Sequence, residues 1–333
     1  MGIDKKMQIL PNTAPIIVTW IPKDTGKTLP DGKNSKFNYV DVLIKHKQKT
    51  NEERDIFLVV NGSGFKSGQI EELRDRFKEV KGVYVIDLHD PKYNPCWKEV
   101  DQGWKINGKD MSIQDYFHDM YNKKPEERTS FAIEIDTFRY IAAYCMLCRQ
   151  KESKIEEGII YIDFDALDSI SNDKYIEQRK KLYNRDNEQK GIGSDITIPD
   201  GILVSKDNND IIAVTDLLIL QKICDQYKQN ILSQDRIKTK FEEKLGKERI
   251  EEILQAKPGK DIMCAIFYSK PEKSYFFEQN IAQLAFNHEL RDMAQSYDVN
   301  FIENGGEYLD QAEKIDNQRV GHNDVSWCKD LYI

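Results

Sequence analysis

The sequence predicts an α/β fold, and two observations carry this prediction. An apolar run of strand length, Asp55 to Val60, is followed by a segment with helical spacing, Gln69 to Phe77, and by a second apolar run, Val83 to Leu88. A strand, a helix and a strand within about 30 residues form a βαβ unit, which is normally a right-handed crossover between parallel strands. Apolar runs without alternation are typical of strands that are buried on both faces of a sheet.

Further segments extend this pattern along the chain. The expected strands are 16–20, 159–162, 201–204, 211–214 and 264–268, and the expected helices are 38–50, 131–149 and 276–296, with two more over 219–255. In this last region Ile219, Ile223 and Tyr227 recur every four residues, whereas the other helical faces are densely charged. Such faces are typical of helices that are solvated on one side, so we expect a projecting helical pair.

Composition excludes several classes of protein. The chain has 49 Lys and Arg residues and 57 Asp and Glu residues, which gives a formal net charge of −8 at pH 7. A net acidic chain argues against nucleic-acid binding, which needs a concentrated basic face. No run approaches the roughly 18 apolar residues of a membrane-spanning helix. The six cysteines are scattered, and the polar first residues resemble no cleavable signal, which favours reduced thiols over a disulfide framework.

The strongest local signal for chemistry is the strand that ends in Asp163-Phe164-Asp165. Alternation along a strand points Asp163 and Asp165 to the same side and Phe164 to the opposite side. In open α/β sheets ligands bind at the carboxyl ends of the strands. Paired carboxylates suit a hard divalent cation that also accepts oxygens from a diphosphate. The pair therefore predicts a Mn²⁺ or Mg²⁺ site, although two acidic residues also occur in ordinary strand-end turns.

A second pair of charged residues precedes this strand. Asp136 and Arg139 are three residues apart at the start of an expected helix, so they share one helical face. A carboxylate can hold sugar hydroxyls, and a guanidinium can take a hydroxyl or a phosphate in a forked geometry. The alternative is a surface ion pair, which contributes only about 0–1 kcal/mol.

The order of these motifs resembles that of GT-A glycosyltransferases, which use nucleotide sugars. Among them, the bacterial effectors that attach N-acetylglucosamine to arginines of host proteins are most similar, followed by the clostridial-type glucosylating toxins. The segments that carry the resemblance are Pro15–Trp20, Leu58–Gly62, Thr137–Arg139, Asp163–Asp165, Pro199–Ile202 and Asn323–Trp327. The resemblance implies a GT-A domain with a helical insertion and a mobile C-terminal lid.

The resemblance also implies an activity and a set of site residues. A sugar, N-acetylglucosamine or glucose, would move from a UDP-sugar to a side chain of a host protein, with a divalent metal and with retention at the anomeric carbon. The implied catalytic residues are Asp136, Arg139, Asp163, Asp165 and Trp327. The implied donor-binding residues are Thr19, Trp20, Phe138, Arg139, Asp163, Ser326 and Trp327. The implied metal ligands are Asp163, Asp165, Asn323, Asp324 and Ser326.

The family's catalytic glutamate has no match here, because the corresponding stretch reads Asp207-Asn208-Asn209-Asp210. The modified side chain (serine, threonine, tyrosine or arginine) therefore stays open. We expect a catalytic core over 1–218, a helical insertion over 219–257 that could bind the acceptor, completion of the core over 258–320 and a lid over 321–333. As in such effectors, we expect secretion without a cleavable signal peptide and action in the host cytoplasm.

Two alternatives remain open from sequence alone. One is an NAD(P) enzyme, because Gly62, Gly64 and Gly68 lie between a strand and a helix, and Asp87 ends the next strand. This is close to the dinucleotide-binding fingerprint, but the last glycine comes one residue late. The other is a catalytically inactive GT-A domain that binds a host protein through helices 219–257. His89, near Asp87, is expected to be structural.

Overall fold

The computed structural model describes a defined part of the chain. The described residues are 7–11, 13–21, 29–30, 38–49, 54–91, 101–106, 109–122, 131–155, 157–164, 167, 196–199, 202–204, 211–215, 217–227 and 234–256. The strand predicted at 264–268, the helix at 276–296, the core segment 258–320 and the lid 321–333 lie outside these residues, as does Asp165.

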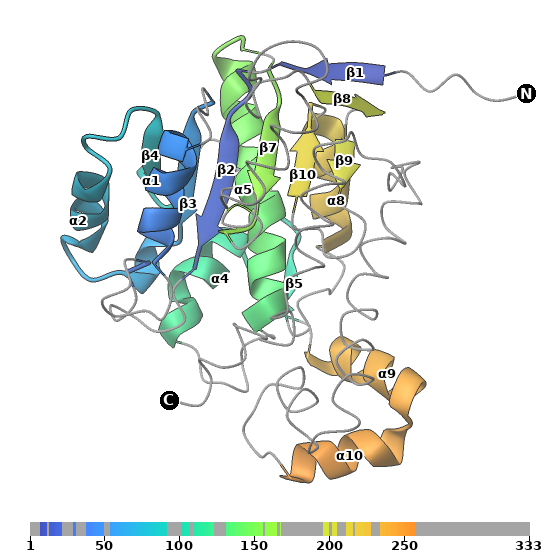
Figure 1. Ribbon diagram of the computed structural model, residues 1–333. Helices are drawn as coiled ribbons and strands as arrows, with labels where there is room; N and C mark the ends of the chain where they lie inside the picture. The colour runs from blue at the N-terminus through green and yellow to red at the C-terminus, as the bar shows by residue number, and fades with distance from the viewer. Residues whose placement is uncertain are drawn as a thin grey trace, which may run out of the picture.

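A six-stranded sheet with the order β4-β3-β2-β7-β10-β9 forms the centre of the fold (Figure 1). Its strands are β2 (Ile16–Trp20), β3 (Ile56–Val60), β4 (Val83–Asp87), β7 (Ile159–Ile162), β9 (Ile202–Val204) and β10 (Ile211–Val214). Strands β2, β3, β4 and β7 are parallel, β10 runs antiparallel to β7, and β9 runs antiparallel to β10. The prediction of an α/β fold around parallel strands is thus confirmed.

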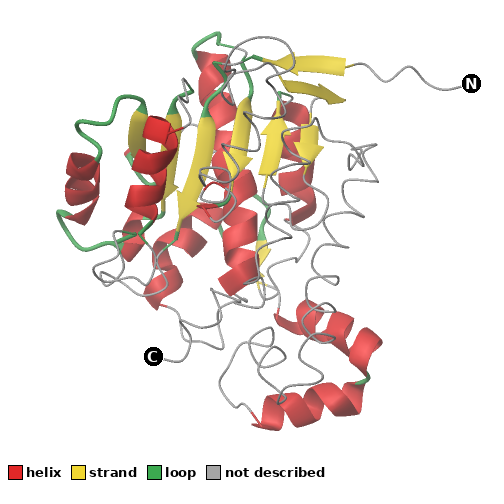
Figure 2. Ribbon diagram, in the orientation of Figure 1, coloured by secondary structure: helices red, strands yellow, loops and turns green. Residues whose placement is uncertain are grey.

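Helices cover both faces of this sheet (Figures 1 and 2). Helices α1 (Tyr39–Lys49) and α2 (Gln69–Arg76) lie on one face, and α5 (Phe131–Glu152) and α8 (Leu217–Tyr227) lie on the other. The chain proceeds from β2 outward to β3 and β4, and then returns through α5 to β7 on the other side of β2. The connections on either side of β2 therefore cross opposite faces, and the carboxyl ends of β2 and β7 form a topological switch point.

Strand alternation divides the residues of the sheet between the two faces. Ile16, Val18 and Ile160 belong to a buried apolar cluster that includes Val40 of α1 and Leu73 of α2. On β2 and β7, the strands that α5 contacts, the residues of the other register lie on the α5 side of the sheet. These two strands therefore bury apolar side chains in the cluster on one face and present a separate set of side chains on the α5 face.

Smaller elements complete the described structure. They are β1 (Met7–Leu10) with β8 (Ile196–Pro199), β5 (Lys105–Ile106) with β6 (Lys109–Asp110), the 3₁₀ turns η1 (Gly62–Gly64) and η3 (Met120–Asn122), and the helices α4 (Ile113–Asp119), α9 (Gln234–Leu245) and α10 (Lys247–Ala256). Helix α4 lies near the edge of the sheet where the parallel strands end (Figure 1).

In the described part of the region 219–255, which was predicted as two helices, the structure has three, α8, α9 and α10. Helix α8 packs on α5 and so belongs to the packing around the sheet, whereas α9 and α10 pack on each other. Gly246 separates α9 from α10 with a φ of +86°, a conformation that glycine adopts without steric cost. The α9–α10 pair lies beyond the carboxyl edge of the sheet (Figure 1). Within the described residues, no helix has both the length and the apolar character that crossing a membrane requires.

Candidate functional site

Three residues predicted from sequence meet at the switch point between β2 and β7. The Arg139 guanidinium of α5 donates a hydrogen bond from Nη2 to Oδ2 of Asp163, at 2.9 Å. Tyr161, two residues earlier on β7, donates its hydroxyl hydrogen to Oδ1 of the same carboxylate. The Tyr161 oxygen lies 3.2 Å from Oγ1 of Thr19 on β2, so Thr19 donates to it. We call Thr19, Arg139, Tyr161 and Asp163 the Asp163 cluster.

Within the Asp163 cluster the arginine is buried, whereas the aspartate is partly exposed to solvent. The Arg139 side chain is 5% exposed, whereas that of Asp163 is 21% exposed. The guanidinium carbon of Arg139 also lies 5.2 Å from the centre of the Tyr161 ring, within the range of a cation–π contact. Burial, reinforced by the Asp163 charge, raises the pKa of the Tyr161 phenol. Tyr161 therefore stays protonated and keeps donating, and the carboxylate is held with one side toward solvent.

Aromatic side chains gather on the opposite face of the same two strand ends. Trp20, the last residue of β2, lies edge-on to Tyr39 of α1, with ring centres 5.4 Å apart, and to Phe164, at 6.5 Å. Tyr39 and Phe164 are stacked at 4.3 Å with an interplanar angle of 16°. Trp20 and Tyr39 are only partly buried. The switch point thus combines a charged cluster on one face with an aromatic cluster on the other.

Some of the predicted site residues lie elsewhere or outside the described structure. Phe138 is fully buried and contacts the ring of Phe117 on α4, with centres 5.0 Å apart. Its predicted contact with nucleotide stays a prediction. The predicted residues whose side chains are outside the description are Asp136, Asp165, Asn323, Asp324, Ser326 and Trp327.

Sequence reasoning missed Tyr161, Tyr39 and Phe164 as members of the site. Tyr161 could have been found from alternation, because it precedes Asp163 by two residues and so shares its face of the strand. Phe164 was predicted to point away from Asp163, and its packing with Tyr39 agrees with this. Nothing local indicates that Tyr39, at the start of a helix, reaches the end of β7.

The predicted metal set is represented in the described structure by Asp163 alone. Both of its carboxylate oxygens already accept a hydrogen bond, one from Arg139 and one from Tyr161. The neighbouring guanidinium disfavours a second cation in direct contact, but the remaining lone pairs can accept from a hydroxyl or from a water. Among the residues described, no three His, Cys, Asp or Glu side chains gather as a metal-binding group. Because both of its oxygens are hydrogen-bonded and a guanidinium lies beside them, Asp163 is better suited to contact a metal-bound water than the metal itself.

The glycine-rich turn does not lie at the switch point. It follows β3, one strand away, and Gly62 to Gly64 form a 3₁₀ turn. The Gly62 N–H donates to Asp87 Oδ1 at 3.0 Å, and so does the N–H of His89. Burial raises the pKa of the Asp87 carboxyl, while these two hydrogen bonds oppose the shift. Asp87 thus accepts hydrogen bonds from the backbone of the turn after β3 and of the turn after β4. In the NAD(P) alternative this carboxylate would bind a ribose instead, so its contacts within the protein disfavour that alternative.

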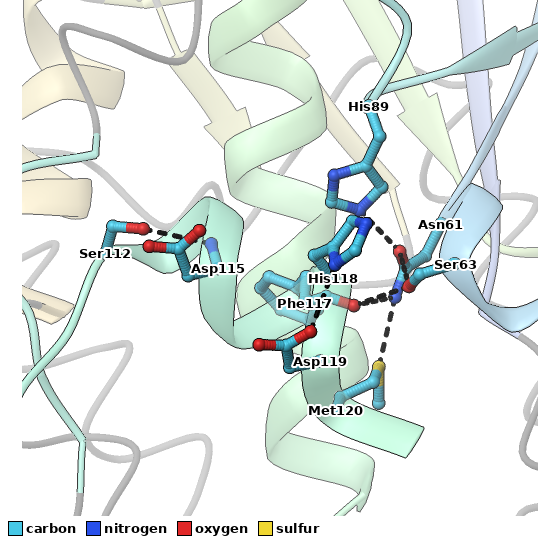
Figure 3. A network of polar contacts seen from close by, with 9 residues as sticks. All are labelled: Asn61, Ser63, His89, Ser112, Asp115, Phe117, His118, Asp119 and Met120. Atoms are coloured by element: carbon cyan, nitrogen blue, oxygen red, sulfur yellow. Dashed lines mark hydrogen bonds and ion pairs between the residues drawn. The ribbon is translucent and has the colours of Figure 1, made fainter. Parts of the chain in front are cut away.

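A second polar network lies beside this turn, at the ends of β3 and β4 (Figure 3). Asn61 donates from Nδ2 to the Phe117 carbonyl at 2.7 Å, and its Oδ1 lies 2.6 Å from His89 Nε2. The Ser63 hydroxyl lies 2.8 Å from both Asn61 Oδ1 and the Phe117 carbonyl. The ring of His118 on α4 lies edge-on to that of His89, with centres 5.4 Å apart. We call Asn61, Ser63, His89 and the end of α4 the Asn61 junction.

The His89 imidazole of this junction is held neutral. Burial, with a smaller contribution from His118, lowers the pKa of His89 to about 4. A neutral imidazole that faces the amide oxygen of Asn61 carries its hydrogen on Nε2. The prediction that His89 is structural agrees with this placement.

Comparisons with known proteins yield only remote structural similarities. No protein-family model matches the chain, and no curated protein matches it. The crystal structure of a bacterial N-acetylglucosamine transferase, NleB, is 17% identical over 72% of this chain and 90% of that chain, with a TM-score of 0.38. The PaToxG glycosyltransferase is 16% identical over 94% of this chain and 89% of that chain, with a TM-score of 0.34. A transferase carrying two cysteine-to-serine substitutions is 16% identical over 67% of this chain and 82% of that chain, with a TM-score of 0.39. Identities and TM-scores this low assign no activity to the chain.

Proposed function

We propose that this protein is a GT-A-type glycosyltransferase that moves N-acetylglucosamine or glucose from a UDP-sugar to a side chain of a protein. The observation that carries the proposal is the meeting of Thr19, Arg139 and Asp163 at the switch point of the sheet. All three were selected from sequence motifs, and they come from β2, α5 and β7. The carboxyl edge at a switch point is where open α/β sheets bind nucleotides.

The Asp163 cluster supplies the polar contacts that such a donor requires. Asp163 keeps lone pairs directed away from Arg139 and Tyr161, so it can accept from a ribose or sugar hydroxyl. Arg139 fixes the carboxylate and places a positive charge near the developing negative charge of the leaving diphosphate. The buried ion pair and the protonated Tyr161 hold this arrangement before the donor arrives, which lowers the cost of ordering it on binding.

The aromatic cluster supplies a surface for the base. Trp20 is only partly buried, and its ring is steeply inclined to those of Tyr39 and Phe164, with interplanar angles of 64° and 75°. In the proposed complex uracil stacks on Trp20, and the diphosphate extends from there across the end of β2 toward Asp163. Stacking of a base on an aromatic side chain is worth about 1–3 kcal/mol.

A divalent metal is part of the proposal. The direct ligands would be Asp165, Ser326 and either Asn323 or Asp324, with Asp163 contacting a metal-bound water or a donor hydroxyl. Bound Mn²⁺ or Mg²⁺ would act as a Lewis acid that neutralises the leaving diphosphate. Asp136 would hold sugar hydroxyls, and Trp327, in a lid over 321–333, would cover the sugar. Retention at the anomeric carbon is proposed from the resemblance alone.

The acceptor side of the proposal rests on the helices beyond the sheet edge. The α9–α10 pair lies on the side of the sheet at which β2 and β7 end (Figure 1). A protein acceptor that contacts this pair would present a side chain toward the Asp163 cluster. We propose that the acceptor belongs to a host cell and that the protein acts there as a secreted effector.

Donor turnover is the decisive test. The protein is incubated with UDP-glucose and with UDP-N-acetylglucosamine, with and without Mn²⁺, and release of UDP is measured together with UDP affinity by calorimetry. We expect metal-dependent UDP binding and slow hydrolysis of at least one donor. UDP binding without any turnover would instead favour the inactive host-binding module, and absence of both would overturn the proposal.

Matched variants locate the activity. Asp163→Asn keeps the volume of the side chain but removes its charge, and it should lower donor turnover by at least about 100-fold, as loss of a positioned charged group does. Asp110→Asn is the control, because Asp110 lies on a two-residue strand with its side chain 82% exposed. Mass spectrometry of a host lysate treated with the active protein would then identify the acceptor.

A further inference from the structure

The Asn61 junction is joined to the Asp163 cluster by a continuous line of buried contacts. Asn61 is fully buried and donates to the carbonyl of Phe117, in the last turn of α4. Carbonyls in the last turn of a helix lack partners within the helix, so an external donor fixes that end in place. The amide of Asn61 is in turn oriented by His89 and Ser63, both of which face its Oδ1.

The next contact leads from α4 to α5. The Phe117 ring packs edge-on against the ring of Phe138, with an interplanar angle of 64°, and both side chains are fully buried. Phe138 directly precedes Arg139 on α5, and Arg139 donates to Asp163. Close-packed interiors have little free volume, so a displacement of Phe117 has to be taken up by its neighbours.

We propose that Asn61 is a positioning residue that sets the placement of Arg139 against Asp163 by way of Phe117 and Phe138. Asn61 touches neither substrate nor reacting atoms in this scheme. In this scheme Phe138, which precedes Arg139, has a role within the protein, because its ring packs against Phe117 at the end of α4. Its consequence for donor binding rests on the proposed function, but its structural part does not.

The test reads the Asp163 cluster directly. Tyrosine labelled with ¹³C at Cζ gives a resonance for Tyr161, identified by its disappearance in Tyr161→Phe, that reports the hydrogen bonds to Asp163 and Thr19. We expect Asn61→Ala to shift this resonance, and to weaken UDP binding by about tenfold. Asn61→Asp keeps the side-chain volume and the oxygen that faces His89 but removes the N–H donor, and it should produce a shift in the same direction.

Leu73→Ala is the matched control, because Leu73 is fully buried on α2, on the opposite face of the sheet. It should lower stability in urea without moving the Tyr161 resonance. The inference is overturned if the resonance stays in place in both Asn61 variants, or if Leu73→Ala moves it as far as Asn61→Ala does. If Asn61→Ala fails to fold, the isosteric Asn61→Asp decides alone. A protein that binds no UDP would refute the proposed function, whereas the Tyr161 resonance would still decide this inference.

Discussion

The two ends of one sheet edge use polar side chains in opposite ways. Where β2 and β7 end, Arg139 and Asp163 form a charged pair, and the carboxylate keeps 21% of its surface exposed. Where β3 and β4 end, Asn61 is fully buried, His89 is held neutral, and the amide oxygen of Asn61 faces His89 Nε2. A partly exposed charge with spare lone pairs can meet a ligand, whereas neutral groups around a buried amide stabilise a junction. This difference distinguishes the part of the sheet edge that we propose to bind the donor, at β2 and β7, from the part that stabilises the fold beside it, at β3 and β4.

Of the changes considered, substitution of Arg139 should lower stability and UDP binding the most. A small effect would contradict the comparison between the two parts of the edge. Arg139→Met keeps much of the side-chain volume but removes the cation beside Asp163, while the hydrogen bond from Tyr161 to this carboxylate remains. Loss of one member of a buried ion pair costs about 3–5 kcal/mol, and the partial exposure of Asp163 places the expected loss at the lower end of this range. Urea unfolding would measure it, and UDP binding should be lost. Wild-type stability would contradict a buried, functional pair.

Acid should weaken the Asn61 junction through His89. The His89 pKa is about 4 in the folded protein, and the ordinary value is 6.5, so the unfolded chain binds more protons between these values. Stability from this group is therefore complete above about pH 6.5 and falls as the pH drops toward 4, by about 3 kcal/mol in total. Urea unfolding measured across this range would show the slope. Among the titratable groups nearby, His118 of α4 lies edge-on to His89, and Asp87 of β4 accepts the backbone N–H of His89. Asp90 interacts electrostatically with Asp87.

Substitution of His89 isolates this contribution. The raised pKa of Asp87 acts with the opposite sign, because a protonated Asp87 is favoured in the folded state as the pH falls. His89→Gln retains an N–H that can face Asn61 Oδ1 but does not titrate, so it should flatten the acid slope, while the opposing contribution of Asp87 remains. A His89→Gln profile that still follows the wild-type slope would show that another group is responsible.

Sequence predicted the strands of this edge better than the contacts along it. Continuous apolar runs identified β2, β3, β4 and β7, and alternation on β7 correctly separated Asp163 from Phe164. Helical spacing predicted Asp136 as a neighbour of Arg139, and the Asp136 side chain lies outside the described residues, so this stays a prediction. Spacing describes one helix face and could not reveal the contact of the guanidinium with Asp163, 24 residues later, which the crossing of α5 over β7 produces.

Non-local pairing accounts for the other omissions. Strands β1 and β8 pair Met7 with Pro199, and neither segment is long or strongly apolar enough to be recognised alone. The Asn61 junction likewise joins the end of β3 to α4 across 56 residues. The polar residues that form it, asparagine, serine and histidine, are common in ordinary turns, so their type carries little information before the fold brings them together.

Gly62→Ala should destabilise the junction side of the edge by an intermediate amount. An added Cβ at this position would overlap the Asp87 carboxylate, which accepts the Gly62 N–H. Forcing an extra carbon into a packed site costs about 1–3 kcal/mol. Thermal or urea unfolding would measure the loss, and Gly62→Ala combined with Asp87→Ala should recover part of it, because the second change removes the overlapping atoms. A double variant less stable than the sum of the single changes would show that the overlap is not the cause.

The smallest loss of stability is expected when the Tyr161 hydroxyl is removed. This change tests whether the Asp163 cluster is ordered before the donor binds. Tyr161→Phe keeps the ring under Arg139 but removes the donor to Asp163 and the acceptor for Thr19. The Arg139–Asp163 contact remains, so stability should fall by only about 1–2 kcal/mol. UDP affinity should fall as well, because Asp163 loses one of the two groups that hold it. Thr19→Val, which leaves the Tyr161–Asp163 contact intact, should cost less affinity than Tyr161→Phe. Equal losses in the two variants would mean that the pairing of Thr19 with Tyr161, rather than the hold on Asp163, is what donor binding depends on.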